Sequence, residues 1–247
     1  MNHSTDNIAL VPARRSPQRL YLPVGILATL MAIGGFWPSY FGPLLGGTID
    51  EPLLIHFHGA VCVGWLALFA VQAGLAATGR VAQHVRLGRW VMAYGLVVIA
   101  VALMVAFATA GADVAAGDAA RGQRRLFGFI REVVFFAAFV AAGWAYRRSP
   151  AVHKRLMVVA TTIFIMPGVG RALLLIHGGP PPLLDWILVW PVPVYLAMLH
   201  DYITKRLVHP AYVIGLLGML AERLVLPLRE SEAWLALSAW LFVPFYQ

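Results

Sequence analysis

The chain has 247 residues, of which 60% are hydrophobic and only 12% are charged. A soluble domain is about 25% charged. This composition, with a mean hydropathy of +0.76, therefore excludes a soluble globular or disordered protein and leaves a polytopic membrane protein. The formal net charge of +8 indicates positive charge kept beside a membrane, and we expect no nucleic-acid partner.

The apolar runs are long and do not alternate with polar residues, which indicates membrane helices rather than barrel strands. We expect an all-α integral membrane bundle of about seven transmembrane helices within residues 20–228, preceded by a cytoplasmic segment at 1–19. The last run, 233–246, is too short to cross, and Trp234, Trp240 and Phe245 predict an interfacial or bundle-packed helix within 229–247. The seven predicted spans are 20–37, 53–77, 90–111, 126–146, 156–177, 183–200 and 211–228.

Arginine and lysine are unevenly distributed between the two sets of loops that these spans define. The N-terminus and the loops after spans two, four and six carry twelve of these residues. The loops on the other side of the membrane carry only Arg121, Arg124, Arg125 and Arg229. Since cytoplasmic loops are enriched in these residues, we expect a bacterial-type inner membrane protein with its N-terminus in the cytoplasm and its C-terminus outside. The richer set is Arg14, Arg15, Arg19, Arg80, Arg86, Arg89, Arg147, Arg148, Lys154, Arg155, Lys205 and Arg206.

Charged residues inside the predicted spans are the strongest indication of a site, because an unpaired charge in hydrocarbon is costly. Arg131 and Glu132 lie in span four and Arg171 in span five, all in the outer half of the membrane. Glu222 and Arg223 lie near mid-depth in span seven. These positions predict an outer polar pocket with Glu132, Arg131 and Arg171 as candidate catalytic residues. The alternative is a set of buried ion pairs, such as Glu132 with Arg171, that only fixes helix packing.

Histidines are expected in two layers, one near each membrane face. His58 and His177 belong to the outer layer, and His84 and His153 to the inner one. His56 and His58 are about 200° apart around a helix, so they cannot face the same ligand. His58 continues a stripe of residues that we expect to face the bundle interior, so we select His58 over His56 as the candidate ligand. The stripe is His58, Cys62, Trp65, Phe69 and Gln72.

Two smaller patterns involve span five. His84-Val85-Arg86-Leu87 and His153-Lys154-Arg155-Leu156 form a faint repeat, which predicts two similar helical hairpins side by side unless both are ordinary basic loops. Within span five, Pro167 with Gly168 and Gly170 predicts a kink just below Arg171.

The stretch His84-Val85-Arg86-Leu87-Gly88-Arg89, with His56-Phe57-His58-Gly59, Trp65 and Gln72, resembles a group of uncharacterised bacterial multi-pass membrane proteins. The segment from Asp201 to Tyr212 resembles the same group. More distantly, helices that open with His-x-x-Leu-Gly resemble those of b-type dihaem membrane cytochromes, in which histidines on facing helices ligate one haem near each membrane face. Span four of this chain has no histidine, which departs from that pattern.

Three functions remain open from the sequence. The first is b-type haem binding and transmembrane electron transfer with a redox partner. His58 and His177 would ligate the iron of an outer haem, and His84 and His153 would hold an inner haem. Arg131 or Arg171 would pair with the haem propionates. The second is a transporter or membrane enzyme in which Glu132 moves protons and the arginines hold a small acidic or amphipathic substrate. The third is a structural or assembly subunit. No lysine lies in a predicted span, which excludes a retinal Schiff base.

Overall fold

The computed structural model of the chain describes residues 20–242, and within them every regular element is helical, which confirms the all-α class. The expected cytoplasmic segment at 1–19 and residues 243–247, including Phe245, lie outside the described residues. In chain order the elements are α1 (Tyr21–Phe36), η2 (Trp37–Phe41), α2 (Gly42–Leu45), α3 (Leu53–Ala77), α4 (Val81–Ala115), α5 (Ala119–Ala145), α6 (Pro150–Phe164), α7 (Met166–His177), α8 (Leu183–Val189), α9 (Val192–Lys205), α10 (Pro210–Leu224), η3 (Leu226–Glu230) and α11 (Glu232–Leu241).

The described helices have the length and composition of a multi-pass membrane protein. Five continuous helical stretches are long and apolar enough to cross a bilayer: Tyr21–Leu45, Leu53–Ala77, Val81–Ala115, Ala119–Ala145 and Pro210–Glu230. Two bent helix pairs, α6 with α7 and α8 with α9, raise the number to as many as seven if each pair counts as one span. This agrees with the predicted number of spans.

Several helix boundaries differ from the apolar runs in the sequence. The third and fourth spans begin earlier than predicted, at Val81 instead of 90 and at Ala119 instead of 126. Helix formation continues through these polar ends because no proline interrupts them, and Asp118 caps α5 by accepting a hydrogen bond from the Arg121 N–H. Hydropathy marks the membrane part of such a helix, not its ends.

Two predicted spans are broken rather than continuous. The bend between α6 and α7 is 44°, and it lies where Pro167 had predicted a kink, since proline removes a helical hydrogen bond. The 49° bend between α8 and α9, next to Pro191, had not been predicted within 183–200. The two breaks touch: the indole N–H of buried Trp190 donates a hydrogen bond of 2.6 Å to the Thr162 carbonyl oxygen.

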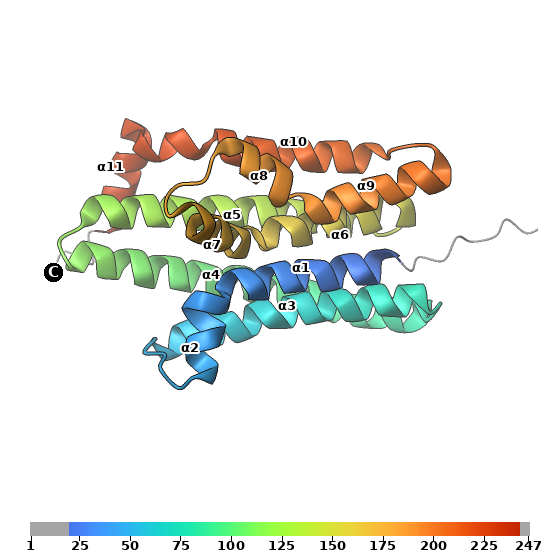
Figure 1. The fold of residues 1–247 in the computed structure, drawn as a ribbon, viewed down its shortest axis with the longest axis horizontal. Coiled ribbons are helices and arrows are strands. Elements are labelled where there is room, and N and C mark those ends of the chain that lie inside the picture. The colour runs from blue at the N-terminus through green and yellow to red at the C-terminus, as the bar shows by residue number, and fades with distance from the viewer. Residues whose placement is uncertain (1–19, 243–247) are drawn as a thin grey trace, which may run out of the picture.

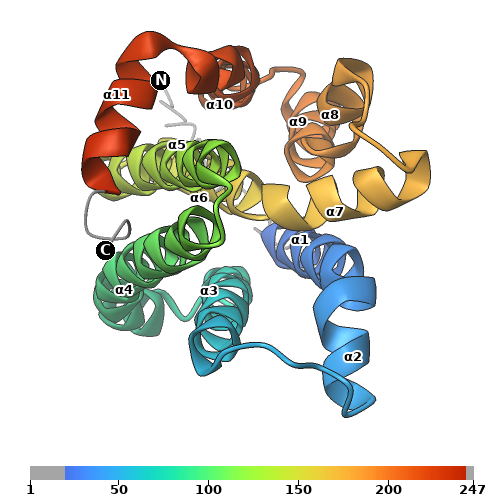
Figure 2. The same ribbon diagram turned by 90° about the vertical axis from the view of Figure 1, so that its left-hand side faces the viewer.

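The loops rich in arginine and lysine lie at one end of the bundle, which we call the basic end. The start of α1 and the α3–α4, α5–α6 and α9–α10 connections gather there (Figure 1). The α4–α5 connection and α11 lie at the other end, which we call the opposite end. Viewed along the bundle, α6 is central, with α1, α5, α9 and α10 packed around it (Figure 2).

The faint sequence repeat corresponds to two helical hairpins, α3–α4 and α5–α6. In both, the first helix runs toward the basic end and the second runs back (Figure 1). Interior positions on α3 and α5 match at a spacing of 71 residues, and one matched pair, Trp65 and Phe136, is in edge-to-face contact with ring centres 5.0 Å apart. The matched pairs are Trp65 with Phe136, Phe69 with Val140, and Gln72 with Gly143.

Small residues let α1 and α7 approach closely. A Cβ on Gly35 would overlap with the Gly168 carbonyl group, and a Cβ on Gly168 would lie 3.0 Å from the Ala32 Cα. Close backbone approach of this kind is how membrane helices pack without a hydrophobic driving force. The neighbouring Gly34 faces open space.

Candidate functional site

The structure brings the two predicted inner histidines, His84 and His153, into contact. His84 lies in the first turn of α4 and His153 in the first turn of α6, so each opens the second helix of its hairpin. Their ring centres are 6.3 Å apart and the ring planes are inclined at 76°. Both side chains are half-buried at the basic end.

Each ring is held by the preceding helix of its own hairpin. Nδ1 of His153 lies 2.8 Å from the Gly143 carbonyl oxygen, and Nδ1 of His84 lies 3.2 Å from the Gln72 carbonyl oxygen. Gln72 and Gly143 are matched positions of the repeat. In both hairpins, therefore, a carbonyl oxygen of the first helix contacts Nδ1 of the histidine on the second helix. An Nδ1–H donated to a carbonyl oxygen leaves Nε2 unprotonated, which is the usual arrangement of a metal-ligating histidine.

The side chain of Gln72 adds a second contact to His84. With its amide oxygen accepting from the Gly88 N–H at 2.8 Å, the amide nitrogen lies 3.2 Å from the His84 carbonyl oxygen and 2.6 Å from Nδ1. This amide would donate to Nδ1, whereas the Gln72 main-chain carbonyl would accept from it. The two contacts correspond to the two neutral tautomers of His84. Ligation through Nε2 requires the tautomer that donates to the carbonyl.

An apolar, aromatic column separates the inner histidines from the charged residues on α5 and α10. Phe136 and Phe164 pack with ring centres 5.1 Å apart, and both contact Trp65. Among the described residues, the buried Trp65 Nε1 and Thr161 Oγ1 have no hydrogen-bond partner. The predicted interior stripe of α3 is confirmed for Trp65, Phe69 and Gln72, which are all buried.

The predicted outer histidines do not form a matching pair. His58 is half-buried beside Cys62, with its Nε2 3.5 Å from the sulfur, whereas His177 pairs with Asp185. No hydrogen bond, ion pair or ring contact joins His58 to His177 within residues 20–242. His56 faces a different neighbour, the Tyr40 hydroxyl, 3.0 Å from its Nδ1.

The charges predicted inside the membrane form a network centred on Glu222, which is fully buried. Arg131 Nε lies 2.7 Å from Glu222 Oε1, and Arg223 Nε lies 2.6 Å from Glu222 Oε2. Glu132 is a peripheral member, with its Oε1 3.6 Å from Arg131 Nη2. Two arginines and two glutamates therefore neutralise one another, and we call these four residues the charge network.

Two details distinguish the arginines of the charge network. The Arg131 Nε contact is not aligned as a hydrogen bond, and its buried Nη1 has no hydrogen-bond partner among the described residues. The Arg223 guanidinium lies 4.4 Å from the ring centre of Trp186 and 5.8 Å from that of Trp190, which adds cation–π contacts. No pattern in the sequence pairs Arg223 with these two tryptophans.

Arg171 makes no ion pair with Glu132 among the described residues. Its guanidinium instead stacks over the Phe36 ring of α1 at 4.3 Å, and Nη1 donates to the Pro167 carbonyl oxygen at 3.4 Å. Of the three candidate catalytic residues, therefore, Arg131 and Glu132 are in contact and Arg171 lies against another helix.

A second buried ion pair lies at the basic end. The sequence pattern does not predict it, because that pattern assigns Arg155 to a basic loop. Arg155 and Asp201 are both almost fully buried, and Arg155 Nε donates to Asp201 Oδ2 at 2.7 Å. Lys205 Nζ lies 2.7 Å from the other carboxylate oxygen. Asp201 is four residues before Lys205 on α9, a spacing that could have indicated their pairing.

The described residues contain no group of three or more histidine, cysteine, aspartate or glutamate side chains able to hold a metal ion. Comparison of the chain with protein-family models, curated proteins and solved structures found no match.

Proposed function

We propose that this membrane protein binds one b-type haem at the basic end, with His84 and His153 as its axial ligands, and that it transfers electrons. The observation that supports the proposal is the spacing of the two rings. Metal–imidazole bonds are about 2 Å long, so two imidazoles on opposite sides of one metal have ring centres about 6 Å apart. The observed separation is 6.3 Å.

The chemistry of the donors favours haem over a bare metal ion. Two imidazoles are too few ligands for a structural zinc ion, which takes four. Haem supplies four nitrogen donors of its own and needs only axial ligands from the protein. His84 and His153 would hold the iron through Nε2, while the carbonyl groups of Gln72 and Gly143 would fix the ring orientations.

The repeat supplies a reason for one haem rather than two. The inner histidines open the second helix of each hairpin and face each other, so both hairpins contribute equally to that site. The outer His58 has Phe129 at the matching position of α5, 71 residues later, and its proposed partner His177 is paired with Asp185. We therefore limit the haem proposal to His84 and His153.

For the charge network we infer a role in packing α5 against α10, not in substrate binding. Its two arginines and two glutamates balance without an added ligand. A transporter or enzyme site for an acidic substrate would present uncompensated positive charge.

The haem proposal is tested by the absorption spectrum of the full-length protein, expressed with added haem precursor and purified in detergent. We expect a Soret band that sharpens and shifts on reduction. His84→Ala and His153→Ala should each abolish it, whereas His56→Ala and His200→Ala should retain it. A colourless wild-type protein after haem reconstitution, or equal spectra in all four variants, would overturn the proposal. Circular dichroism of each variant shows whether the helical bundle is intact.

A further inference from the structure

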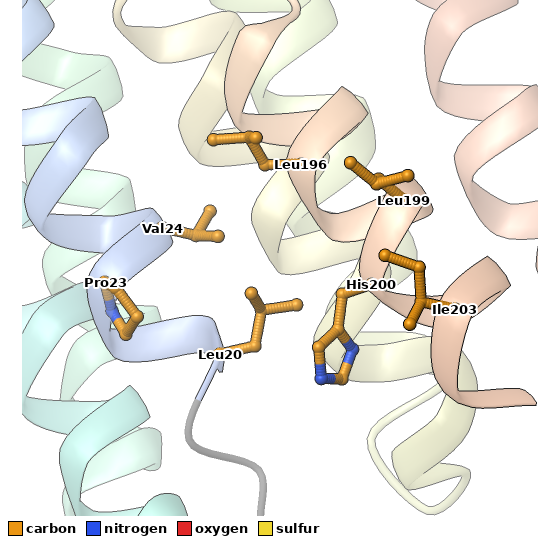
Figure 3. Close-up of a pocket in the computed structure, with 7 residues that line it drawn as sticks. All are labelled: Leu20, Pro23, Val24, Leu196, Leu199, His200 and Ile203. Atoms are coloured by element: carbon orange, nitrogen blue, oxygen red, sulfur yellow. The ribbon is translucent and has the colours of Figure 1, made fainter.

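An apolar groove lies between α1 and α9 at the basic end. It has a volume of about 290 Å³. Figure 3 shows that it lies between the two helices, with the His200 ring among the aliphatic side chains. Its lining residues are Leu20, Pro23, Val24, Leu196, Leu199, His200 and Ile203. Leu199 and Ile203 are more than half exposed, so the groove opens to the surface that the bilayer covers.

Positive charge exceeds negative charge beside this groove. Lys205 follows the lining residue Ile203 on α9, and Lys154 lies over the ring of Tyr21, the neighbour of Leu20, at 5.1 Å. Arg155 and Lys205 share the single carboxylate of Asp201. Three cations therefore share one negative group: Lys154, Arg155 and Lys205.

The polar lining side chain, His200, has one ring nitrogen without a hydrogen bond. Buried Nδ1 of His200 has no hydrogen-bond partner among the described residues, and the nearest carboxylate oxygen, on Asp201, is 3.9 Å away. A ligand in the groove would therefore meet aliphatic carbon along most of its length. At the basic end it would meet the imidazole of His200 and an excess of positive charge.

We propose that this groove is a binding site for an anionic phospholipid. One acyl chain lies along the aliphatic lining, and the phosphate lies at the basic end beside Lys205 and Lys154. Basic pockets between membrane helices on the cytoplasmic side recognise anionic headgroups in this way. Neither His84 nor His153 lines the groove, so either proposal can fail without the other.

The test is native mass spectrometry of the full-length protein in detergent, titrated with phosphatidylglycerol or phosphatidylcholine of identical acyl chains. We expect preferential retention of phosphatidylglycerol. Each of Lys205→Gln and Lys154→Gln should weaken that retention about five-fold, the effect of one basic residue near a lipid surface. Arg80→Gln and Arg89→Gln are the matched controls, because they remove cations from the α3–α4 hairpin at the same end of the bundle and do not line the groove.

The acyl-chain part of the proposal has its own variant. Leu199→Trp should fill the groove and reduce phosphatidylglycerol retention, whereas Leu217→Trp, at an exposed position of α10, should not. Soluble glycerol phosphate should not compete at millimolar concentration, because it lacks the chain. Equal retention of the two lipids, equal effects of the lysine and arginine variants, or full retention in Leu199→Trp would each overturn the proposal.

Discussion

Trp65 and Phe136 pack edge to face, with ring centres 5.0 Å apart and planes inclined at 82°, at matching positions of the two repeated hairpins. His84 and His153 repeat this relationship closer to the basic end. Equivalent residues that contact each other lie near the local axis relating two repeats. The proposed haem site therefore lies where both hairpins present a histidine to the same space.

The contact between α1 and α7 predicts different effects for two adjacent glycines. Gly35→Ala should destabilise the protein, because its Cβ would overlap with the Gly168 backbone and force the helices apart. Gly34→Ala should be neutral or slightly stabilising, since its Cβ meets nothing within 4 Å and alanine favours a helix by up to about 1 kcal/mol over glycine. Thermal melting in detergent measures both. Equal melting temperatures for the two variants would contradict the close approach.

The charge network predicts a large effect for Glu222→Gln. Removing one partner of a buried ion pair costs about 3–5 kcal/mol, because the remaining charges are left uncompensated. Glu230→Gln is the matched control: its pair with Arg229 is exposed, and such pairs contribute about 1 kcal/mol or less. Denaturant unfolding monitored by tryptophan fluorescence gives both free energies of unfolding.

The same network also predicts which arginine compensates for this loss. Arg131→Met combined with Glu222→Gln should recover part of the lost stability. When Arg171→Met is combined with Glu222→Gln, the two losses of unfolding free energy should instead sum to within about 0.5 kcal/mol. Strict additivity with Arg131→Met would show that Arg131 and Glu222 do not interact. Coupling of Glu222 to Arg171 would contradict the assignment of Arg131 as its partner.

His209 predicts a pH dependence at the start of α10. Its Nδ1 accepts a hydrogen bond from the Ala211 N–H at 3.1 Å, so the ring must be neutral there. Burial lowers the pKa of His209 below 6.5, and nearby Arg155 lowers it further. The unfolded chain then binds more protons, so this contribution is complete above pH 6.5 and is lost as the pH falls through the folded-state pKa.

The control for this pH dependence is His209→Asn, which keeps a capping side chain but does not titrate. The melting temperature of the wild type, relative to that of the variant, should decline as the pH is lowered from 7.5 to 5. Parallel curves over this range would contradict the role assigned to His209.

The distribution of arginine and lysine predicts that the basic end faces the cytoplasm. Single cysteines introduced at Asp50 and Arg148, in a Cys62→Ala background, should react with an impermeant thiol reagent from opposite sides of the membrane. Asp50→Cys should be labelled from outside and Arg148→Cys only after the membrane is opened. The reverse pattern would invert the orientation without changing the fold.

Hydropathy and periodicity predicted the helical class, the number of spans and the interior stripe of α3. These features depend on residues close together in sequence, so one chain is enough to detect them. The kink at Pro167 was predictable for the same reason, because proline acts on its own turn. The break next to Pro191 was missed because the apolar run of 183–200 continues through it.

Pairing between helices was much less predictable. The sequence placed Arg131, Glu132, Arg171 and Glu222 at similar depths, but depth does not determine which faces meet. Helix rotation brings Arg131 to Glu222 and turns Arg171 toward Phe36. His84 and His153 were expected to share a site because both lie in the inner histidine layer and each opens the second helix of a repeated hairpin.

The hydrogen bond from Trp190 to the Thr162 carbonyl oxygen ties the two broken spans together mechanically. In a continuous helix that carbonyl would accept from the Met166 N–H, four residues later. Straightening α6 into α7 would therefore displace the indole, which is anchored beside the bend between α8 and α9. The two bends are therefore coupled through this hydrogen bond, so a change in one bend would disturb the other.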